Sequence, residues 1–316
     1  MYKSGSQSRP REIALPAGHN PARESRTLPR RGLIFIAVLG LFFLAGIPAV
    51  SADYYTVAQV IQSGGQVFIG EQGLDISNAF SLAGGSHTMS NTAIGWWTSA
   101  SKINSASATK IVSVAEGKEN NFAISPADFV RYTGTWYLVD KETGRAIQPL
   151  VQVFTVRDPA LDITLVSDGS DVSGKSIERG KDLRFRIDTN QYTALDSASR
   201  SPVYHDSRDG YVDINLRTDS GAKLTSLYGT DDSTHSLTGL AVSTALWTWG
   251  ETSTPAAPYS WDTNALDPST GLYEYPAGTY TVWAESLLNN MKENYRINGA
   301  DYTGKTVSRI CTITLE

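Results

Sequence analysis

The chain has 316 residues, of which 41% are hydrophobic and 19% are charged, and its formal net charge is −5 at pH 7. This size permits one large domain or two ordinary ones, and the acidic balance disfavours nucleic acid and anionic lipid as partners. The single cysteine, Cys311, excludes a disulfide within the chain, and its alternating segment predicts a small buried hydrophobe.

The first 52 residues have the pattern of an export signal. Seven of the 27 Lys and Arg residues and two of the 32 acidic residues lie there, which leaves 20 basic and 30 acidic residues, a net charge near −10. The uncharged stretch 32–50 follows this basic arm and leads into small residues. We predict signal-peptide cleavage between Ala52 and Asp53. A stretch of this length can also span a bilayer, so an uncleaved N-terminal membrane anchor is the alternative.

Strand-like segments fill the rest of the chain. Short runs rich in Val, Ile, Thr, Tyr, Phe and Trp alternate with turns rich in Gly, Ser, Asn and Asp. The absence of long amphipathic segments between them favours antiparallel sandwiches over a parallel sheet. The predicted fold is all-β, with two consecutive immunoglobulin-like antiparallel β-sandwich domains after the N-terminal signal or apolar helix. The predicted strands are 66–69, 94–97, 135–139, 150–156, 161–166, 183–187, 211–216, 279–284 and 307–315.

A domain boundary is predicted near Arg157-Asp158-Pro159, because proline prevents the preceding strand from continuing. The domains are then 53–157 and 160–316, and the polar segments 190–206, 228–236 and 251–271 are long loops of the second. Ser125-Pro126 predicts the start of a short helical turn. A second turn is predicted at 287–295, although Asn289-Asn290 weakens it.

No catalytic motif is present. The sequence has no Gly-x-Ser-x-Gly elbow, no His-Glu-x-x-His and no metal-type cysteine pair. His87, His205 and His235 lie far apart. His205-Asp206-Ser207 has the residue types of a triad, but neighbours on an extended chain point to opposite faces. We therefore expect a protein that is not an enzyme and binds no cofactor.

Calcium is the one metal that the sequence suggests. The segment from His205 to Asp213 places Asp206, Asp209 and Asp213 around an Asp-Gly turn, and calcium prefers several carboxylate oxygens on one curved loop. Similar turn aspartates stand at positions 168, 171, 262 and 267. The alternative is that these carboxylates accept hydrogen bonds from their own backbone.

The tryptophans have two interpretations: packing in a core, or an exposed platform for glycans. The adjacent pair Trp96-Trp97 must place one ring on each face of a strand, whereas Trp247 and Trp249 share a face. The full set is Trp96, Trp97, Trp136, Trp247, Trp249, Trp261 and Trp283.

Several strings in the sequence resemble an uncharacterised family of exported, surface-layer-like envelope proteins of methanogenic archaea. They are VFIGEQGLDI at 67–76, YTGTWY at 132–137, FRIDTN at 185–190, YPAGTYTVWAE at 275–285, NNMKENY at 289–295 and GKTVS at 304–308. The resemblance implies a cell-envelope location and β-sandwich domains, and it supplies no catalytic residues. Such proteins often carry a Thr/Pro-rich stalk and a C-terminal anchor, which this sequence lacks. Attachment is therefore expected to come from an uncleaved N-terminal helix or from lattice contacts, or the protein is not attached at all.

These observations lead to two functional hypotheses. The first is a structural, S-layer-like protein, extracellular or in the cell envelope, that self-associates or binds other envelope proteins through sandwich faces or edge strands. The final strand, 307–315, is the expected edge. The second is a secreted binding or adhesion module for glycans or another surface protein. Neither involves nucleic acid, and contact with the membrane is expected only through an uncleaved N-terminal segment.

Overall fold

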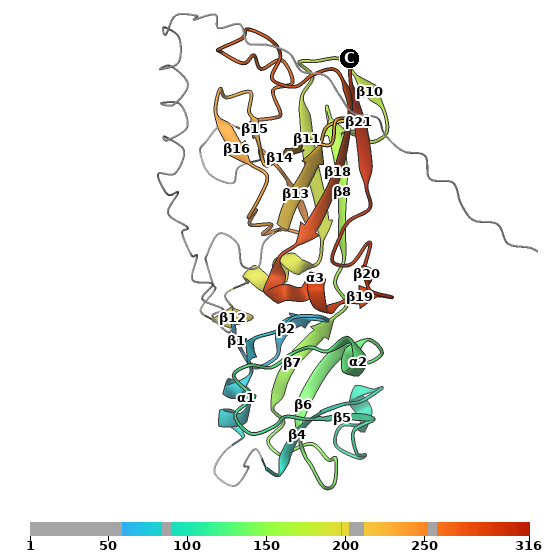
Figure 1. The fold of residues 1–316 in the computed structure, drawn as a ribbon. Coiled ribbons are helices and arrows are strands. Elements are labelled where there is room, and N and C mark those ends of the chain that lie inside the picture. Colours follow the sequence, from blue (N-terminus) through green and yellow to red (C-terminus); the bar gives the residue numbers. More distant parts are fainter. Residues whose placement is uncertain (1–58, 84–89, 197, 202–211, 252–257) are drawn as a thin grey trace, which may run out of the picture. The chain divides into compact units, whose positions relative to one another are not determined.

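The computed structural model describes residues 59–83, 90–196, 198–201, 212–251 and 258–316 (Figure 1). The predicted signal segment, with Ala52 and Asp53, lies outside this part of the chain and stays a prediction. No helix among the described residues is long and apolar enough to cross a membrane.

A five-stranded sheet with the order β2-β7-β6-β4-β5 forms the centre of the first half. Its strands are β2 (Gly65–Phe68), β4 (Thr92–Trp96), β5 (Lys110–Ser113), β6 (Gly134–Asp140) and β7 (Gln152–Arg157). β2 pairs with β7 in parallel, and the other pairs are antiparallel. The remaining elements here are β1 (Gln59–Ile61), β3 (Leu74–Asp75), α1 (Ser77–Leu82), η1 (Ala100–Lys102) and α2 (Pro126–Phe129).

Both faces of this sheet are buried. Ile94, Trp136 and Leu138 pack on one face with apolar residues of β1, β3, α1 and α2. Ala93 and Val139 alternate to the other face and pack with residues near η1. The described residues do not confirm the sandwich of two antiparallel sheets that we expected for 53–157. The five-stranded sheet is mixed, because β2 and β7 pair in parallel, and short elements that include the parallel β1–β3 pair cover one of its faces.

Two facing sheets form the second half. One has the order β10-β21-β18-β13-β14 and the other the order β17-β11-β8-β9. Apolar residues of β8, β11, β13, β18 and β21 fill the space between them. The strands are β8 (Leu161–Ser167), β9 (Ser170–Asp171), β10 (Ser176–Ile177), β11 (Leu183–Thr189), β13 (Val212–Arg217), β14 (Lys223–Leu224), β17 (Leu246–Thr248), β18 (Gly278–Ser286) and β21 (Cys311–Leu315).

Short elements replace parts of the predicted loops. Segment 228–236 contributes to the hairpin of β15 (Ser226–Tyr228) and β16 (Thr234–Ser236). Segment 190–206 includes η2 (Gln191–Leu195) and β12 (Arg200–Ser201). The predicted turn at 287–295 is present as η3 (Leu288–Asn290) and α3 (Met291–Asn294), and Asn289 and Asn290 separate them with positive φ angles of 41° and 57°. A second hairpin follows, with β19 (Arg296–Ile297) and β20 (Ala300–Asp301).

The final strand is not the free edge that we expected. β21 begins only at Cys311, and it lies between β18 and β10. Segment 174–177 covers its outer side: Gly174 donates to the Thr312 carbonyl at 2.7 Å, and Thr314 donates to the Lys175 carbonyl at 3.0 Å. The prediction of an exposed edge at 307–315 is therefore wrong, because a distant two-residue strand takes up its outward-facing backbone groups.

Polar contacts connect the two halves on either side of residue 158. β12 pairs with β1, and the Arg200 guanidinium forms a bidentate ion pair with Glu71 at 2.7 and 2.8 Å. Asp158 accepts hydrogen bonds from Tyr295 at 3.1 Å and from Lys305 at 2.6 Å. Segment 190–201 thus contributes a strand to a sheet of the first half rather than a free loop of the second. The division into domains 53–157 and 160–316 stays a prediction.

Candidate binding groove

The predicted calcium site falls largely outside the described residues, since Asp206 and Asp209 lie there. Asp213 is in β13, where its Oδ1 accepts the backbone N–H of Gly239 at 2.8 Å. Within the described ranges no group of three or more His, Cys, Asp or Glu side chains is placed to hold a metal ion. Calcium binding at Asp206, Asp209 and Asp213 therefore stays a prediction, because the structure does not describe all three residues.

The other turn aspartates support their own turns. Asp171, Asp262 and Asp267 each accept the backbone N–H two residues further on, at 2.8, 2.9 and 2.8 Å. At Asp267 the hydrogen bonds from Ser269 hold the pKa of the carboxyl below its usual value. The structural interpretation of these three residues is confirmed, because the carboxylates close local turns.

Of the three histidines His87, His205 and His235, the structure describes only His235. Its Nε2 lies 2.9 Å from Asp231 Oδ1, and its ring stacks on Tyr259. Burial raises the pKa of the Tyr259 hydroxyl, and the Asp231 carboxylate adds to that effect.

Cys311 packs half-buried against the core of the second half, as its alternating segment predicts. Burial raises the pKa of its thiol to about 11. The thiol is therefore protonated at neutral pH and behaves as a small hydrophobe.

Most of the tryptophans are core residues. Trp97, Trp136, Trp249 and Trp261 are buried. As predicted, the adjacent pair divides between the two faces of its sheet, with Trp96 in one hydrophobic cluster and Trp97 in the other. The glycan platform suggested for Trp247 and Trp249 is wrong. Trp249 is 0% exposed, because its ring packs edge-on against Phe185 inside the sandwich.

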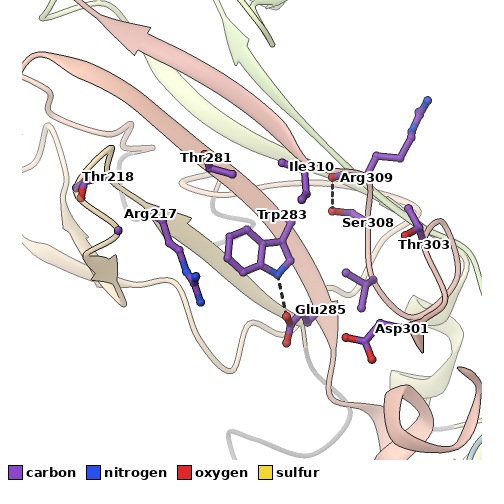
Figure 2. A pocket seen from close by; sticks show the side chains of 12 residues that line it. Arg217, Thr218, Thr281, Trp283, Glu285, Asp301, Thr303, Ser308, Arg309 and Ile310 are labelled. Atoms are coloured by element: carbon purple, nitrogen blue, oxygen red, sulfur yellow. Dashed lines mark hydrogen bonds between the residues drawn. The ribbon is translucent and has the colours of Figure 1, made fainter. Parts of the chain in front are cut away.

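Trp283 differs from these, because it lies half-exposed in a groove on the outer face of the five-stranded sheet of the second half. Along β18 the side chains alternate, with Tyr280, Val282 and Ala284 buried and Thr281 and Trp283 on the other face. The groove has a volume of about 750 Å³. In Figure 2 the indole ring lies at its centre, with Arg217 on one side and Ser308 and Ile310 on the other.

Two charged neighbours fix the indole ring. Its Nε1 donates to Glu285 Oε1 at 2.8 Å, and the Arg217 guanidinium carbon lies 5.1 Å from the ring centroid (Figure 2). The register explains this arrangement, because Asn215 pairs with Trp283 and Arg217 with Thr281, which makes Arg217 a diagonal neighbour of the indole. The ring therefore has a defined orientation before any ligand binds.

Glu285 is held as a carboxylate. Burial alone raises the pKa of Glu285, but the hydrogen bonds from Lys292, at 2.7 Å, and from Trp283 outweigh it and bring the pKa below its usual value. Burial alone lowers the pKa of Lys292, but the hydrogen bond to Glu285 and the negative charges of Glu285, Asp301 and Glu293 together raise the pKa above its usual value. The groove therefore contains a fixed acceptor at neutral pH.

We did not predict this groove from the sequence, although the sequence contains a signal for it. The string TYTVWAE alternates apolar and polar residues, and Trp283 stands on the polar face with Thr279, Thr281 and Glu285. A large aromatic ring on the solvent face of a strand is typical of a recognition surface. Arg217 and the segment 301–310 join it only through tertiary structure.

The sequence pattern of a protein family described as a domain of unknown function, DUF3821, matches residues 63–293. The chain belongs to this family. The DUF3821 segment includes β13 and β18, and with them Arg217, Trp283 and Glu285 of the groove. The groove residues Asp301, Thr303 and Ser308 follow after its end. A search of curated proteins finds no match to the chain.

Proposed function

We propose that this protein is an exported, non-catalytic component of the cell envelope that binds a glycan in the groove around Trp283. The observation that carries the proposal is the half-exposed Trp283 ring, oriented by Glu285 and Arg217 in a groove of about 750 Å³. Export, the extracellular location and the surface-layer-like character rest on the N-terminal sequence and the resemblance. The immunoglobulin-like arrangement of 160–316 is part of the same proposal.

The chemistry of the groove suits a sugar. The C–H groups of a pyranose ring carry slight positive charge and pack against the negative face of an aromatic ring. Hydroxyl groups then need donors and acceptors around that face, and hydroxyl side chains of Thr218, Thr281, Thr303 and Ser308 line this groove. Such a combination of an apolar surface with a few placed polar groups is the common pattern of small-molecule sites.

The charge state of Glu285 supports binding over hydrolysis. A glycoside hydrolase needs one carboxylic acid with a raised pKa to protonate the leaving group. Glu285 and Asp301 both line the groove, but each accepts a hydrogen bond from a cation, Lys292 at 2.7 Å and Arg296 at 2.8 Å. The lowered pKa of Glu285 makes it an acceptor for sugar hydroxyls rather than a proton donor.

Binding of the purified full-length protein to a glycan array, followed by calorimetry with the sugars that bind, tests the proposal. We expect Trp283→Ala to weaken binding at least about tenfold, since the stacking surface is removed. Trp247→Ala is the matched control, because Trp247 is half-buried against the opposite sheet and should leave binding unchanged. An array without a bound glycan, or equal effects of the two variants, overturns the proposal.

A second candidate function is assembly through the edge strand β5, and one observation favours it. β5 pairs only with β4, and no hydrogen bond to its outer side is present among the described residues. The opposite edge of the same sheet is different, because Arg200 donates to the Gln66 carbonyl and Glu71 accepts from the Phe68 N–H. An unpaired edge is a template for another strand.

Electron microscopy and sedimentation of the full-length protein test this second function. The side chain of Ile111, in β5, is 37% exposed, and Ile111→Lys places a charge where a neighbouring strand would pack. We expect the variant to lose ordered sheets or filaments. Leu272→Lys, at a residue that is 70% exposed in a loop, should keep them. A wild-type protein that stays monomeric rules out assembly.

A further inference from the structure

One charged side chain that lines the groove, Arg217, has no ion-pair partner among the described residues. The inference drawn from it rests on the proposed function. Glu285 is paired with Lys292, Asp301 with Arg296, and Arg309 with Asp162. Arg217 is exposed, and within the described part of the chain it forms no ion pair and no side-chain hydrogen bond. Its guanidinium contacts the Trp283 ring. Arg217 is therefore the positively charged group in the groove that can pair with an anionic ligand.

A second unpaired cation lies beside Arg217. In the β13–β14 pair, Arg217 stands directly opposite Lys223, so both side chains extend from the same face of the sheet. Lys223 is also exposed and forms no ion pair among the described residues. Asp219, in the turn that joins the two strands, accepts the backbone N–H of Thr279 at 2.9 Å. Like charges directly opposite one another destabilise a sheet, and a bound anion would relieve that repulsion.

We propose that the groove is specific for an acidic sugar, whose carboxylate or sulfate group binds between Arg217 and Lys223 while the ring packs against Trp283. The planar guanidinium of Arg217 matches a carboxylate or sulfate with two parallel hydrogen bonds, and Lys223 adds a point charge. The chain as a whole is acidic, at −5, so long-range attraction does not explain such a preference. The preference must come from this local pair of cations.

Calorimetry with the full-length protein tests the specificity with four probes. The probes are a galacturonic acid oligosaccharide, its methyl ester, a sulfated oligosaccharide of the same length, and inorganic sulfate. We expect the acidic oligosaccharides to bind at least about tenfold more tightly than the ester at low salt, and the difference to shrink as salt is raised. Binding of only one of the two acidic oligosaccharides identifies which anion the cations accept.

Three variants separate the roles of the residues. Arg217→Gln should remove the preference for the acid over the ester while weak binding of the ester remains. Trp283→Ala should weaken both sugars. Lys118→Gln is the control, because Lys118 is an exposed cation of the first half that does not line the groove, and it should leave the preference unchanged. Circular dichroism confirms that each variant is folded.

The outcomes distinguish this proposal from the proposed function. Equal binding of acid and ester overturns the specificity and leaves glycan binding intact. Inorganic sulfate that binds as tightly as the sulfated oligosaccharide shows a simple anion site and overturns the role of the sugar ring. Absence of binding to any sugar, in the array as well as here, overturns both proposals.

Discussion

At the scale of single residues, Glu71 and Arg200 form a buried ion pair. Both side chains are almost completely buried, at 0% and 1% exposure. Arg200 donates to both Glu71 oxygens and to the Gln66 carbonyl, and Asn289 donates to Glu71 at 3.1 Å. A buried ion pair offsets its desolvation cost only when its hydrogen-bonding groups are satisfied, and here they are largely satisfied by the chain itself.

Removing one partner of this pair should therefore be costly. We expect Arg200→Ala to lower the free energy of unfolding by about 3–5 kcal/mol, because it leaves the Glu71 carboxylate buried without its cation. Urea denaturation followed by fluorescence measures the effect. Lys110→Ala is the control, since the Lys110–Asp128 pair is partly exposed and should contribute about 1 kcal/mol or less. Similar losses for the two variants would contradict the buried pair's importance.

The Glu285–Lys292 pair gives a prediction on pH. The pKa of Glu285 is below its ordinary value of 4.5 in the folded protein, so its contribution to stability is complete above that value and is lost as pH falls through the folded pKa. The raised pKa of Lys292 acts in the opposite sense, and its contribution is lost only as pH rises above 10.5. We expect Glu285→Gln to cost about 1 kcal/mol at pH 7 and almost nothing near pH 2. Thermal unfolding at a series of pH values measures this, and a cost that is independent of pH refutes it.

At the scale of elements, a close approach of two backbone segments restricts the residue that can follow β17. Gly250 follows β17 with a φ of +85°, and a Cβ atom there would lie 1.9 Å from the Tyr259 carbonyl oxygen. Tyr259 donates its backbone N–H to the Gly250 carbonyl at 3.0 Å. The two segments approach so closely that only glycine fits, and this contact brings Trp249 and Tyr259 together.

Substitution at Gly250 should show this constraint. We expect Gly250→Ala to cost more than about 2 kcal/mol, since it adds a backbone clash to the cost of about 1 kcal/mol for alanine at positive φ. Gly271→Ala is the matched control, because Gly271 has a φ of +68° with open space around its Cβ position, and should cost only about 1 kcal/mol. Chemical denaturation compares them, and equal costs would show that the close approach to Tyr259 has no energetic role.

At the scale of the whole molecule, the main hydrophobic cores of the two halves are separate clusters. Polar contacts, strand pairing and a small buried apolar cluster of Phe68, Ala194, Leu288 and Met291 connect the halves. β12 belongs to the second half of the sequence and pairs with β1, and Tyr295 packs in the core of the first half while it donates to Asp158. Residues 55–316 form one compact unit by their contacts. Unfolding of either half would therefore expose buried side chains and unpaired backbone groups of the other half.

This coupling predicts cooperative unfolding. We expect tryptophan fluorescence and far-UV circular dichroism to give coincident transitions for the full-length protein, because β12 and the segment of η3 and α3 connect the two cores. Three described tryptophans report on the first half and four on the second, so the fluorescence covers both. Two resolved transitions would instead indicate independent domains, as the sequence predicts.

Local patterns in the sequence predicted the strands well, because alternation depends only on which face of each strand is buried. The runs 135–139, 161–166, 183–187 and 279–284 all lie within observed strands. Asn289-Asn290 correctly marked an interruption, since asparagine tolerates positive φ. The local role of Asp171, Asp262 and Asp267 was also predicted correctly, because each accepts a backbone hydrogen bond from only two residues along the chain.

Tertiary structure alone decided which strands are neighbours and which polar faces come together. The parallel pairing of β2 with β7 and the cover of β21 by β10 join segments that are far apart in the sequence, and hydrophobic alternation contains no information on such partners. The groove also depends on the pairing of strands that are distant in the sequence. The sequence placed Trp283 on the polar face of a strand, but only the register of β13 with β18 brings Arg217 beside its ring. Register is set by the packing of both sheets over the shared core, which is a property of the folded molecule.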